Sequence, residues 1–241
     1  MDRALFAAAS GMAAQQTNLD TVANNLSNSE VAGYKGSSQS FAALAAPGER
    51  GLGTIALGEH VVFTQGKLER SDGSFDMAID GPGFFVLRAG QDVAYTRDGE
   101  FSRDADGTLR NASGWQLDGV RIPADALKAS VDAKGAVTVT TPAGTHTVAH
   151  LKLALFPAPE RLRGVGGTIF HVTPESGRPR LLSPGGQDGP QIRFGMVEQS
   201  NVSIIESMMA ILSAQRAYEA NAKGVQAADE MLRIANNLQR G

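Results

Sequence analysis

The chain has 241 residues, of which 42% are hydrophobic and 20% are charged, and it contains no cysteine. This length is enough to bury a hydrophobic core, so we expect a globular protein with one or two compact parts. The lack of cysteine excludes disulfides and thiolate metal sites. The formal net charge is −3, and lysine and arginine are scattered along the chain. This pattern argues against nucleic acid as a partner.

The first predicted element is a helix over about residues 2–28. Apolar residues recur in it every seven positions, at Leu5, Met12, Leu19 and Leu26. Seven residues make two helical turns, so these side chains form a seam along one face. A charged start followed by alanines is also typical of a secretory signal peptide. Cleavage there would destroy the seam, so we expect the helix to be retained.

The middle of the chain changes from irregular to β-rich. Residues 29–60 contain Pro47 and several glycines, which predict a loop or irregular extended chain. Residues 61–194 contain six Asp-Gly pairs between short apolar runs. Asp-Gly supplies the positive φ angles of tight hairpins, so this region is predicted to be antiparallel β. The expected strands are 77–79, 84–87, 93–96, 115–117, 137–140, 145–148, 151–156 and 168–171.

The last predicted element is one long helix, from about Asn201 to Leu238. Its apolar residues also recur every seven positions: Ile204, Ile211, Tyr218, Val225 and Leu232. At 1.5 Å per residue this helix is roughly 55 Å long, against about 40 Å for the first. If the two seams pair, about a dozen of its residues have no partner within the chain, and another subunit is the natural cover.

These elements together predict an α+β protein in three parts. Residues 1–60 hold the N-terminal helix and the irregular segment, residues 61–195 the β-rich domain, and residues 196–241 the C-terminal helix, which packs on the first. Small residues in both helices are expected to let the backbones approach closely: Gly11, Ala214, Ala217, Gly224 and Ala228.

Asparagine pairs stand near the end of each helix: Asn24 and Asn25, and Asn236 and Asn237. They either terminate the helices or bridge neighbouring subunits through their amides. No stretch approaches the ~20 apolar residues of a membrane span, so we expect no membrane insertion.

The sequence shows no constellation for catalysis. The histidines, His60, His146, His150 and His171, have no second ligand at a metal spacing and are interpreted as surface or edge residues. Asp104 could open a calcium loop, but Leu109 and Trp115 occupy the positions that need glycine and glutamate. Neither a nucleophile elbow nor a phosphate loop is present. We therefore expect no enzyme activity, no cofactor and no metal.

Several sequence blocks resemble those of the bacterial flagellar axial protein family, which includes rod and hook proteins. The blocks are Ser10-Gly11-Met12, 22–28 and Gly33-Tyr34-Lys35 near the start, 65–68, 76–85 and 95–101 in the middle, and 197–202, 215–223 and 228–232 near the end. They span nearly the whole chain in the family's order. Ser27 and Gly224 depart from the residues that are usual there.

This resemblance implies a non-enzymatic structural subunit of the periplasm-spanning flagellar basal-body rod. Such proteins are exported by the flagellar type III apparatus without a cleaved signal, and they polymerise through paired terminal helices into a hollow, torque-transmitting shaft. The implied partners are copies of the chain, other rod and hook proteins, the surrounding ring proteins and the export apparatus. The short middle favours a rod subunit over a hook subunit, while distal and proximal rod positions both stay open.

Two other functions stay open from the residues alone. One is a secreted β-domain module that binds carbohydrate or protein and is oligomerised by a terminal coiled coil. The other is a hydrolase whose catalytic groups are not recognisable by spacing. A rod subunit should have mobile termini as a dilute monomer and be trimmed by protease to roughly residues 60–195, whereas the binding module should form a discrete dimer or trimer.

Overall fold

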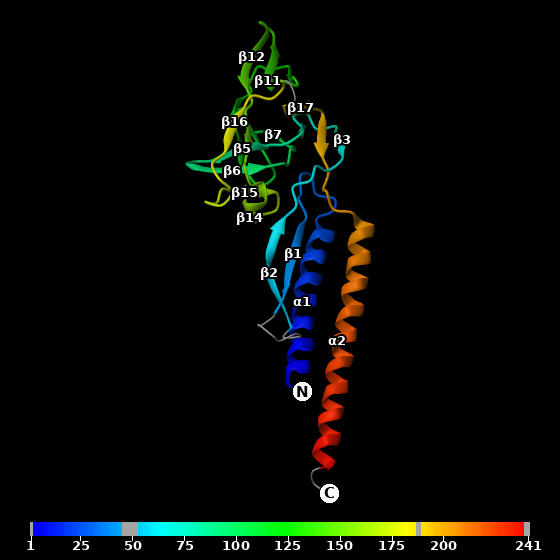
Figure 1. The fold of residues 1–241 in the computed structure, drawn as a ribbon. Helices are drawn as coiled ribbons and strands as arrows, with labels where there is room; N and C mark the ends of the chain where they lie inside the picture. The colour runs from blue at the N-terminus through cyan, green and yellow to red at the C-terminus, as the bar shows by residue number, and fades with distance from the viewer. Residues whose placement is uncertain (1, 45–52, 187–188, 239–241) are drawn as a thin grey trace. The chain divides into compact units, whose positions relative to one another are not determined.

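The computed structural model describes residues 2–44, 53–186 and 189–238, apart from the side chains of residues 2–4, 232 and 235–238. The predicted α+β class is confirmed: the chain has a helix at each end and antiparallel sheets in the sequence between them (Figure 1). The chain forms two compact units. Unit 1 combines residues 1–28, 37–62 and 202–241, and unit 2 combines residues 29–36 and 63–201. The grouping therefore differs from the three consecutive parts expected.

Unit 1 is a pair of helices with a two-stranded ribbon. The helices are α1 (Asp2–Ser27) and α2 (Ile204–Leu238), and the strands are β1 (Ser37–Ala43) and β2 (Thr54–Val61). The two helices run side by side in opposite directions, and the ribbon lies along α1 (Figure 1). Both helices follow the residues that the heptad pattern predicted, to within three positions at each end.

The ribbon corrects part of the expectation of an irregular segment over residues 29–60. Residues 29–36 contain no strand, as expected, while residues 45–52, with Pro47, lie outside the described residues. Strands β1 and β2 pair antiparallel, with Ser37 opposite Val61 and Ala43 opposite Thr54. The ladder shifts register between Ser40 and Phe41. Gly58, which faces Ser40, has a φ of 138°, a value that glycine adopts without strain. Gly58, one of the glycines that suggested irregular chain, therefore lies in a bulged strand instead.

Unit 2 is built from short strands and one 3-10 turn, η1 (Pro159–Arg161). The strands are β3 (Leu68–Arg70), β4 (Met77–Asp80), β5 (Phe84–Ala89), β6 (Asp92–Thr96), β7 (Ser102–Arg103), β8 (Thr108–Arg110), β9 (Gln116–Arg121), β10 (Lys128–Val131), β11 (Ala136–Thr141), β12 (Gly144–His150), β13 (Leu153–Leu155), β14 (Arg163–Gly166), β15 (Ile169–His171), β16 (Arg180–Leu182), β17 (Gln191–Phe194) and β18 (Met196–Glu198). The main sheet has the order β14-β15-β6-β5-β9-β8-β7, with β13 joined to both β5 and β16. Smaller sheets are β10-β11-β12, β4-β17 and β3-β18.

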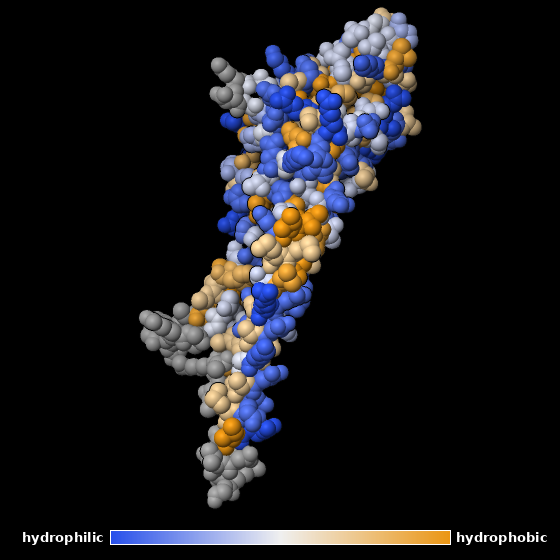
Figure 2. Space-filling view, turned by 90° about the vertical axis from the view of Figure 1, so that its right-hand side faces the viewer, coloured by the Kyte–Doolittle hydropathy of each residue, from blue (hydrophilic) through white to orange (hydrophobic). Residues whose placement is uncertain are grey.

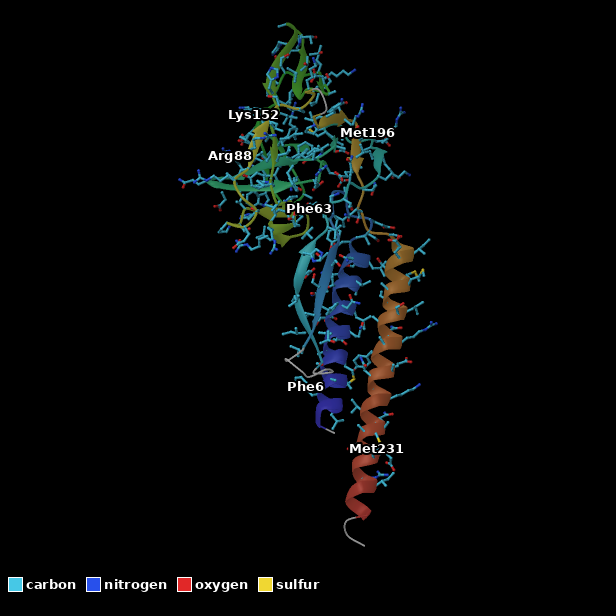
Figure 3. The ribbon with its side chains drawn as sticks, viewed as in Figure 1. Phe6, Phe63, Arg88, Lys152, Met196 and Met231 are labelled. Atoms are coloured by element: carbon cyan, nitrogen blue, oxygen red, sulfur yellow. The ribbon has the colours of Figure 1, made fainter. Side chains whose placement is uncertain are left out.

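The hydrophobic core of unit 2 gathers the inward-facing side chains of these sheets. Its fully buried members include Met77, Ile79, Phe85 and Leu87 on β4 and β5. Burying each side chain of this size contributes about 1.5–3 kcal/mol. Next to it, the ring of Phe63 (labelled in Figure 3) stacks edge-on with two other phenylalanines at 5.0 and 5.2 Å, which extends the apolar interior.

The Asp-Gly pairs predict the β class correctly but rarely the turns. Of the pairs within the described residues, only Asp106-Gly107 closes a hairpin between two paired strands, β7 and β8. Gly99 has another role, because a Cβ there would lie 1.6 Å from the carbonyl oxygen of Met77. That glycine lets two backbones touch, and the Met77 amide donates to its carbonyl at 3.0 Å.

Candidate assembly interface

The contact between α1 and α2 is made by small residues. On α2, Ser207, Ala214 and Ala228 are buried at heptad spacing, and Asn221 stands at the intervening heptad position. A Cβ on Gly11 of α1 would lie 2.9 Å from the Asn221 Nδ2 atom, so the glycine faces that side chain directly. Small side chains at a heptad period let the two helix backbones approach closely.

The α1 side of this contact follows the same rule. Ala14 and Thr21 are buried seven residues apart. Gly224 takes no part in the close approach within the described chain, because no heavy atom outside its own stretch of helix lies within 4 Å of the position its Cβ would take. Ala217 is half-buried. The close packing within the chain therefore depends on Gly11 and the buried alanines.

The described large residues of the predicted seam are not among the fully buried residues of the two helices. All four on α1 are half-buried, namely Leu5, Met12, Leu19 and Leu26. On α2, Ile211 and Val225 are half-buried, Ile204 and Tyr218 are exposed, and the side chain of Leu232 lies outside the described residues. The buried heptad of α2 starts three residues after Ile204. A role of the large residues in assembly stays a prediction.

The beginning of α2 exposes a cluster of large apolar side chains, here called the α2 patch: Ile205, Met208, Met209 and Leu212. They lie on successive turns of one face, and Ile205 is 72% exposed. The space-filling view shows apolar side chains gathered over this part of the helix (Figure 2). Exposed apolar clusters on a helix mark interaction sites more often than solvated surface.

The far end of α2 is also uncovered. The helix has 35 residues against 26 in α1 and extends past the N-terminal end of α1 (Figure 1). Met231 and Ile234 are exposed there, and Met231 is labelled in Figure 3. This is the unequal length that the sequence predicted, and it leaves a helical segment without a partner in the described chain.

The asparagines near the end of α1 make contacts within the chain. The Asn25 Nδ2 atom donates to the Ser37 carbonyl at 2.7 Å, and its Oδ1 atom accepts from the Ser37 amide at 2.8 Å. The Asn24 Oδ1 atom accepts from Asn28 at 3.1 Å. Asn25 therefore joins the end of α1 to the start of β1. The side chains of Asn236 and Asn237 lie outside the described residues, and bridging between subunits stays a prediction for the pairs.

We expect replacement of Gly11 by leucine to weaken the helix pair. The new side chain meets Asn221 and forces the backbones apart, which costs about 1–3 kcal/mol before any gain in helix propensity. Thermal unfolding followed by circular dichroism at a helix wavelength should show a lower midpoint. Gly224→Leu is the matched control, since the space around it is open and leucine favours the helix by several tenths of a kcal/mol. Equal effects at both positions would contradict the packing described.

Unit 2 contains a buried ion cluster that the sequence did not reveal. The Lys35 Nζ atom lies 2.5 Å from Glu198 Oε1, and the Arg97 Nη1 atom lies 3.1 Å from Glu198 Oε2. The Glu198 side chain is completely buried, and both cations are nearly so. Burial lowers the pKa of Lys35 and of Arg97, and the Glu198 carboxylate opposes that shift. The charged forms of Lys35 and Arg97 are therefore stabilised by Glu198, and the two cations in turn compensate the buried carboxylate.

The carboxylate of Asp98 is buried in the same unit. Its Oδ1 atom accepts from the Glu100 amide at 3.0 Å, and its Oδ2 atom accepts from the Thr168 hydroxyl at 3.5 Å. Burial raises the pKa of Asp98 from 3.8 to about 6, and the negative charges of Glu100 and Asp76 act in the same direction. Near neutral pH the Asp98 carboxylate of the folded protein therefore carries a buried negative charge, which lowers the free energy of unfolding.

We expect Asp98→Asn to be more stable than the wild type at pH 8, by about 2–3 kcal/mol. Because the pKa is raised in the folded state, the stabilising proton is fully bound below about pH 4 and is lost as the pH rises through about 6. Asparagine does not titrate. Its Oδ1 atom can still accept from the Glu100 amide, and its Nδ2 atom can donate to the Thr168 hydroxyl oxygen in place of the bond that the carboxylate accepts. Urea unfolding from pH 4 to pH 8 should show the two proteins converging at the acid end. A constant difference over this range would contradict the pKa assignment.

The four histidines lie on three different strands of the two units. His146 and His150 are exposed on β12, His60 lies on β2 with its Nδ1 atom 3.4 Å from the Ser40 hydroxyl, and the His171 ring stacks edge-on with Trp115. Within the described ranges no three His, Cys, Asp or Glu side chains are grouped to hold a metal. None of the helices described is both long enough and apolar enough to cross a membrane.

Matches to known proteins extend over the whole chain. Family models match residues 5–35 (flagella basal body rod protein), 78–139 (flagellar hook protein FlgE/F/G D1 domain) and 194–238 (flagellar basal body rod FlgEFG protein C-terminal). The flagellar basal-body rod protein FlgG of Borreliella burgdorferi is 36% identical, with 100% of each chain covered. The chain belongs to the flagellar basal-body rod protein family.

Other relatives agree with this assignment. FlgG of Agrobacterium fabrum is 33% identical over 97% of this chain and 98% of its own, and FlgG of Bacillus subtilis is 29% identical over the full length of both. The flagellar hook protein FlgE of Treponema pallidum matches 49% of this rod-family chain and 30% of its own length. The family models cover α1, the middle of unit 2 and α2, and the matched residues include all three members of the ion cluster.

Proposed function

We propose that this chain is a structural, non-enzymatic subunit that polymerises through α1 and α2 into the flagellar rod. The observation that supports this most directly is the α2 patch. The fully buried residues of α2 are small, and the large side chains of the α2 patch are left exposed. Because the chain belongs to the rod family, the partners that would cover this apolar face are further copies of the chain and other axial proteins.

The size of the α2 patch is consistent with a weak contact between any two subunits and a stable polymer in which each subunit has several contacts. Fully burying four such side chains contributes ~6–12 kcal/mol, and about half of that remains to be gained because they are already partly covered. Joining two proteins costs at least about 4 kcal/mol in lost freedom of motion. One contact of this size is therefore marginal, while a subunit held by several neighbours in a helical polymer is stable.

The finer parts of the proposal rest on the family. The chain is located in the rod of the flagellar basal body, where it transmits torque as part of a hollow shaft. Its partners are other rod and hook proteins, the surrounding rings and the flagellar type III export apparatus, with the N-terminal helix retained. Every full-length relative named above is a FlgG protein, which supports a place in the rod over one in the hook.

Sedimentation of the purified chain across a wide concentration range tests this function. A rod subunit should be monomeric when dilute and form long polymers above a threshold concentration, with its termini protected from protease only in the polymer. A discrete dimer or trimer at all concentrations would favour the oligomeric binding module instead. Turnover of a substrate that is abolished by replacing one histidine would favour a hydrolase.

A further inference from the structure

The ion cluster lies where the chain enters and leaves unit 2. The segment 29–36 belongs to unit 2, although α1 precedes it and β1 follows it in sequence. The chain returns to unit 2 at residue 63 and leaves it after Asn201. Lys35, Thr64 and Glu198 each lie within three residues of one of these crossings. The three passages of the chain, residues 29–36, 63–67 and 198–201, therefore meet around one set of side chains.

Hydrogen bonds connect every pair of these passages. The Lys35 Nζ atom donates to the Thr64 carbonyl at 2.8 Å. The Gly36 amide donates to Asn201 Oδ1 at 2.8 Å, and the Asn201 Nδ2 atom donates to the Thr64 hydroxyl at 2.9 Å. The Gly33 amide donates to the Glu198 carbonyl at 2.6 Å. Each passage is thus held by the other two.

The carboxylate of Glu198 is the centre of this arrangement. Its Oε1 atom accepts from Lys35 and, at 2.9 Å, from the Gly66 amide, while its Oε2 atom accepts from Arg97. Arg97 follows β6 and also donates to the Gly81 carbonyl at 2.8 Å. One buried carboxylate therefore joins all three passages, and Arg97 connects them to the main sheet.

Two glycines show how tightly the passages are packed against one another and against the chain at Asp98. A Cβ on Gly66 would lie 1.9 Å from the Gln199 carbonyl oxygen. A Cβ on Gly33, whose φ is 68°, would lie 2.2 Å from the Asp98 amide nitrogen. Backbone meets backbone at both points. The separation of the passages is therefore fixed by contact, and the charges hold them at that separation.

We propose that Lys35, Arg97 and Glu198 form an ionic latch that holds the three passages together and transfers mechanical load from them to the β-sheet of unit 2. The latch is a structural property of the chain, and its mechanical role rests on the function proposed above. A buried charge cluster suits this role because its members are costly to separate: opening it leaves unpaired charges in an apolar interior.

Hydrogen exchange of the full chain, followed by mass spectrometry, tests the latch. In Glu198→Gln, amides in residues 31–36, 64–67 and 198–201 should exchange at least tenfold faster, while those in β5 and β6 change less than twofold. Asp80→Asn, which breaks the exposed Asp80–Arg193 ion pair, is the control and should leave the three passages unchanged. Uniform acceleration throughout unit 2, or no acceleration in the passages, would overturn the proposal.

A second variant keeps the test decisive if Glu198→Gln does not fold. Lys35→Met preserves the Arg97–Glu198 pair and should loosen residues 31–36 and 64 selectively.

In cells, either variant should form flagella and lose swimming speed disproportionately in viscous medium. If cells that lack this chain still made flagella and swam normally, the proposed function would be contradicted, while the exchange result would stand. Failure of the proposed function and failure of the latch are therefore distinguishable. Normal swimming in viscous medium despite loosened passages would overturn the mechanical role.

Discussion

Replacing Glu198 with alanine is expected to lower the free energy of unfolding by about 3–5 kcal/mol. The substitution removes the only carboxylate that contacts Lys35 and Arg97 among the described residues, and both cations are almost fully buried. It also leaves the Gly66 amide without the acceptor it has in the wild type. Urea unfolding measures the loss, and fluorescence of the single tryptophan, Trp115, reports on unit 2.

Asp80→Ala is the matched control for this measurement. It removes the acid of the ion pair with Arg193, in which the two side chains are 47% and 42% exposed. Such a pair contributes at most about 1 kcal/mol, because water screens it. If the losses in Glu198→Ala and Asp80→Ala were equal, the buried cluster would contribute no more than a surface pair, and the account of unit 2 would be wrong.

The second large effect is expected on assembly, with little change in the folded monomer. In the double variant Ile205→Glu and Met209→Glu, two carboxylates replace side chains that are 72% and 63% exposed. Position 205 lies in the first turn of α2, where the helix dipole favours negative charge, and this offsets the small repulsion between acids four residues apart, so the monomer should unfold at about the same temperature. Burying the carboxylates against another copy costs several kcal/mol, so polymerisation and motility should be lost.

Leu127→Glu provides the control for the loss of assembly. Leu127 is 74% exposed and lies in unit 2, so the change has the same chemistry at a position outside the helices. We expect this variant to polymerise and to support swimming. The proposed role of the α2 patch would be contradicted if the double variant polymerised normally in sedimentation assays, or if Leu127→Glu abolished assembly to the same extent.

Helix periodicity and strand composition were enough to predict much of the fold. The heptads placed both helices, because an amphipathic pattern sustained over many turns has few competing interpretations. The ribbon of β1 and β2 was missed because glycine in a strand gives the same local signal as glycine in a loop. Asp-Gly located few of the hairpins, since Gly99 is needed for a close approach to Met77 that lies far away in sequence.

The candidate site was only partly predictable. The sequence indicated the heptad period but not which face turns inward, because large apolar residues were assumed to be buried, and Ser207 and Ala214 are buried instead. A chain that also packs against copies of itself has two apolar faces, and periodicity alone does not rank them. The ion cluster had no local signal either. Glu198 is 163 residues from Lys35 and 101 from Arg97, and only the folded chain brings them together.

Photo-crosslinking from Met209 tests the central claim, assembly through the exposed face of α2, most directly. A photoreactive amino acid at this position captures whatever protein lies against the α2 patch in intact flagellated cells. The account predicts crosslinked species that contain a second copy of this chain or another axial protein, and their loss when Ile205→Glu is added. Efficient labelling that yields only monomer, in cells whose flagella contain the chain, would contradict it.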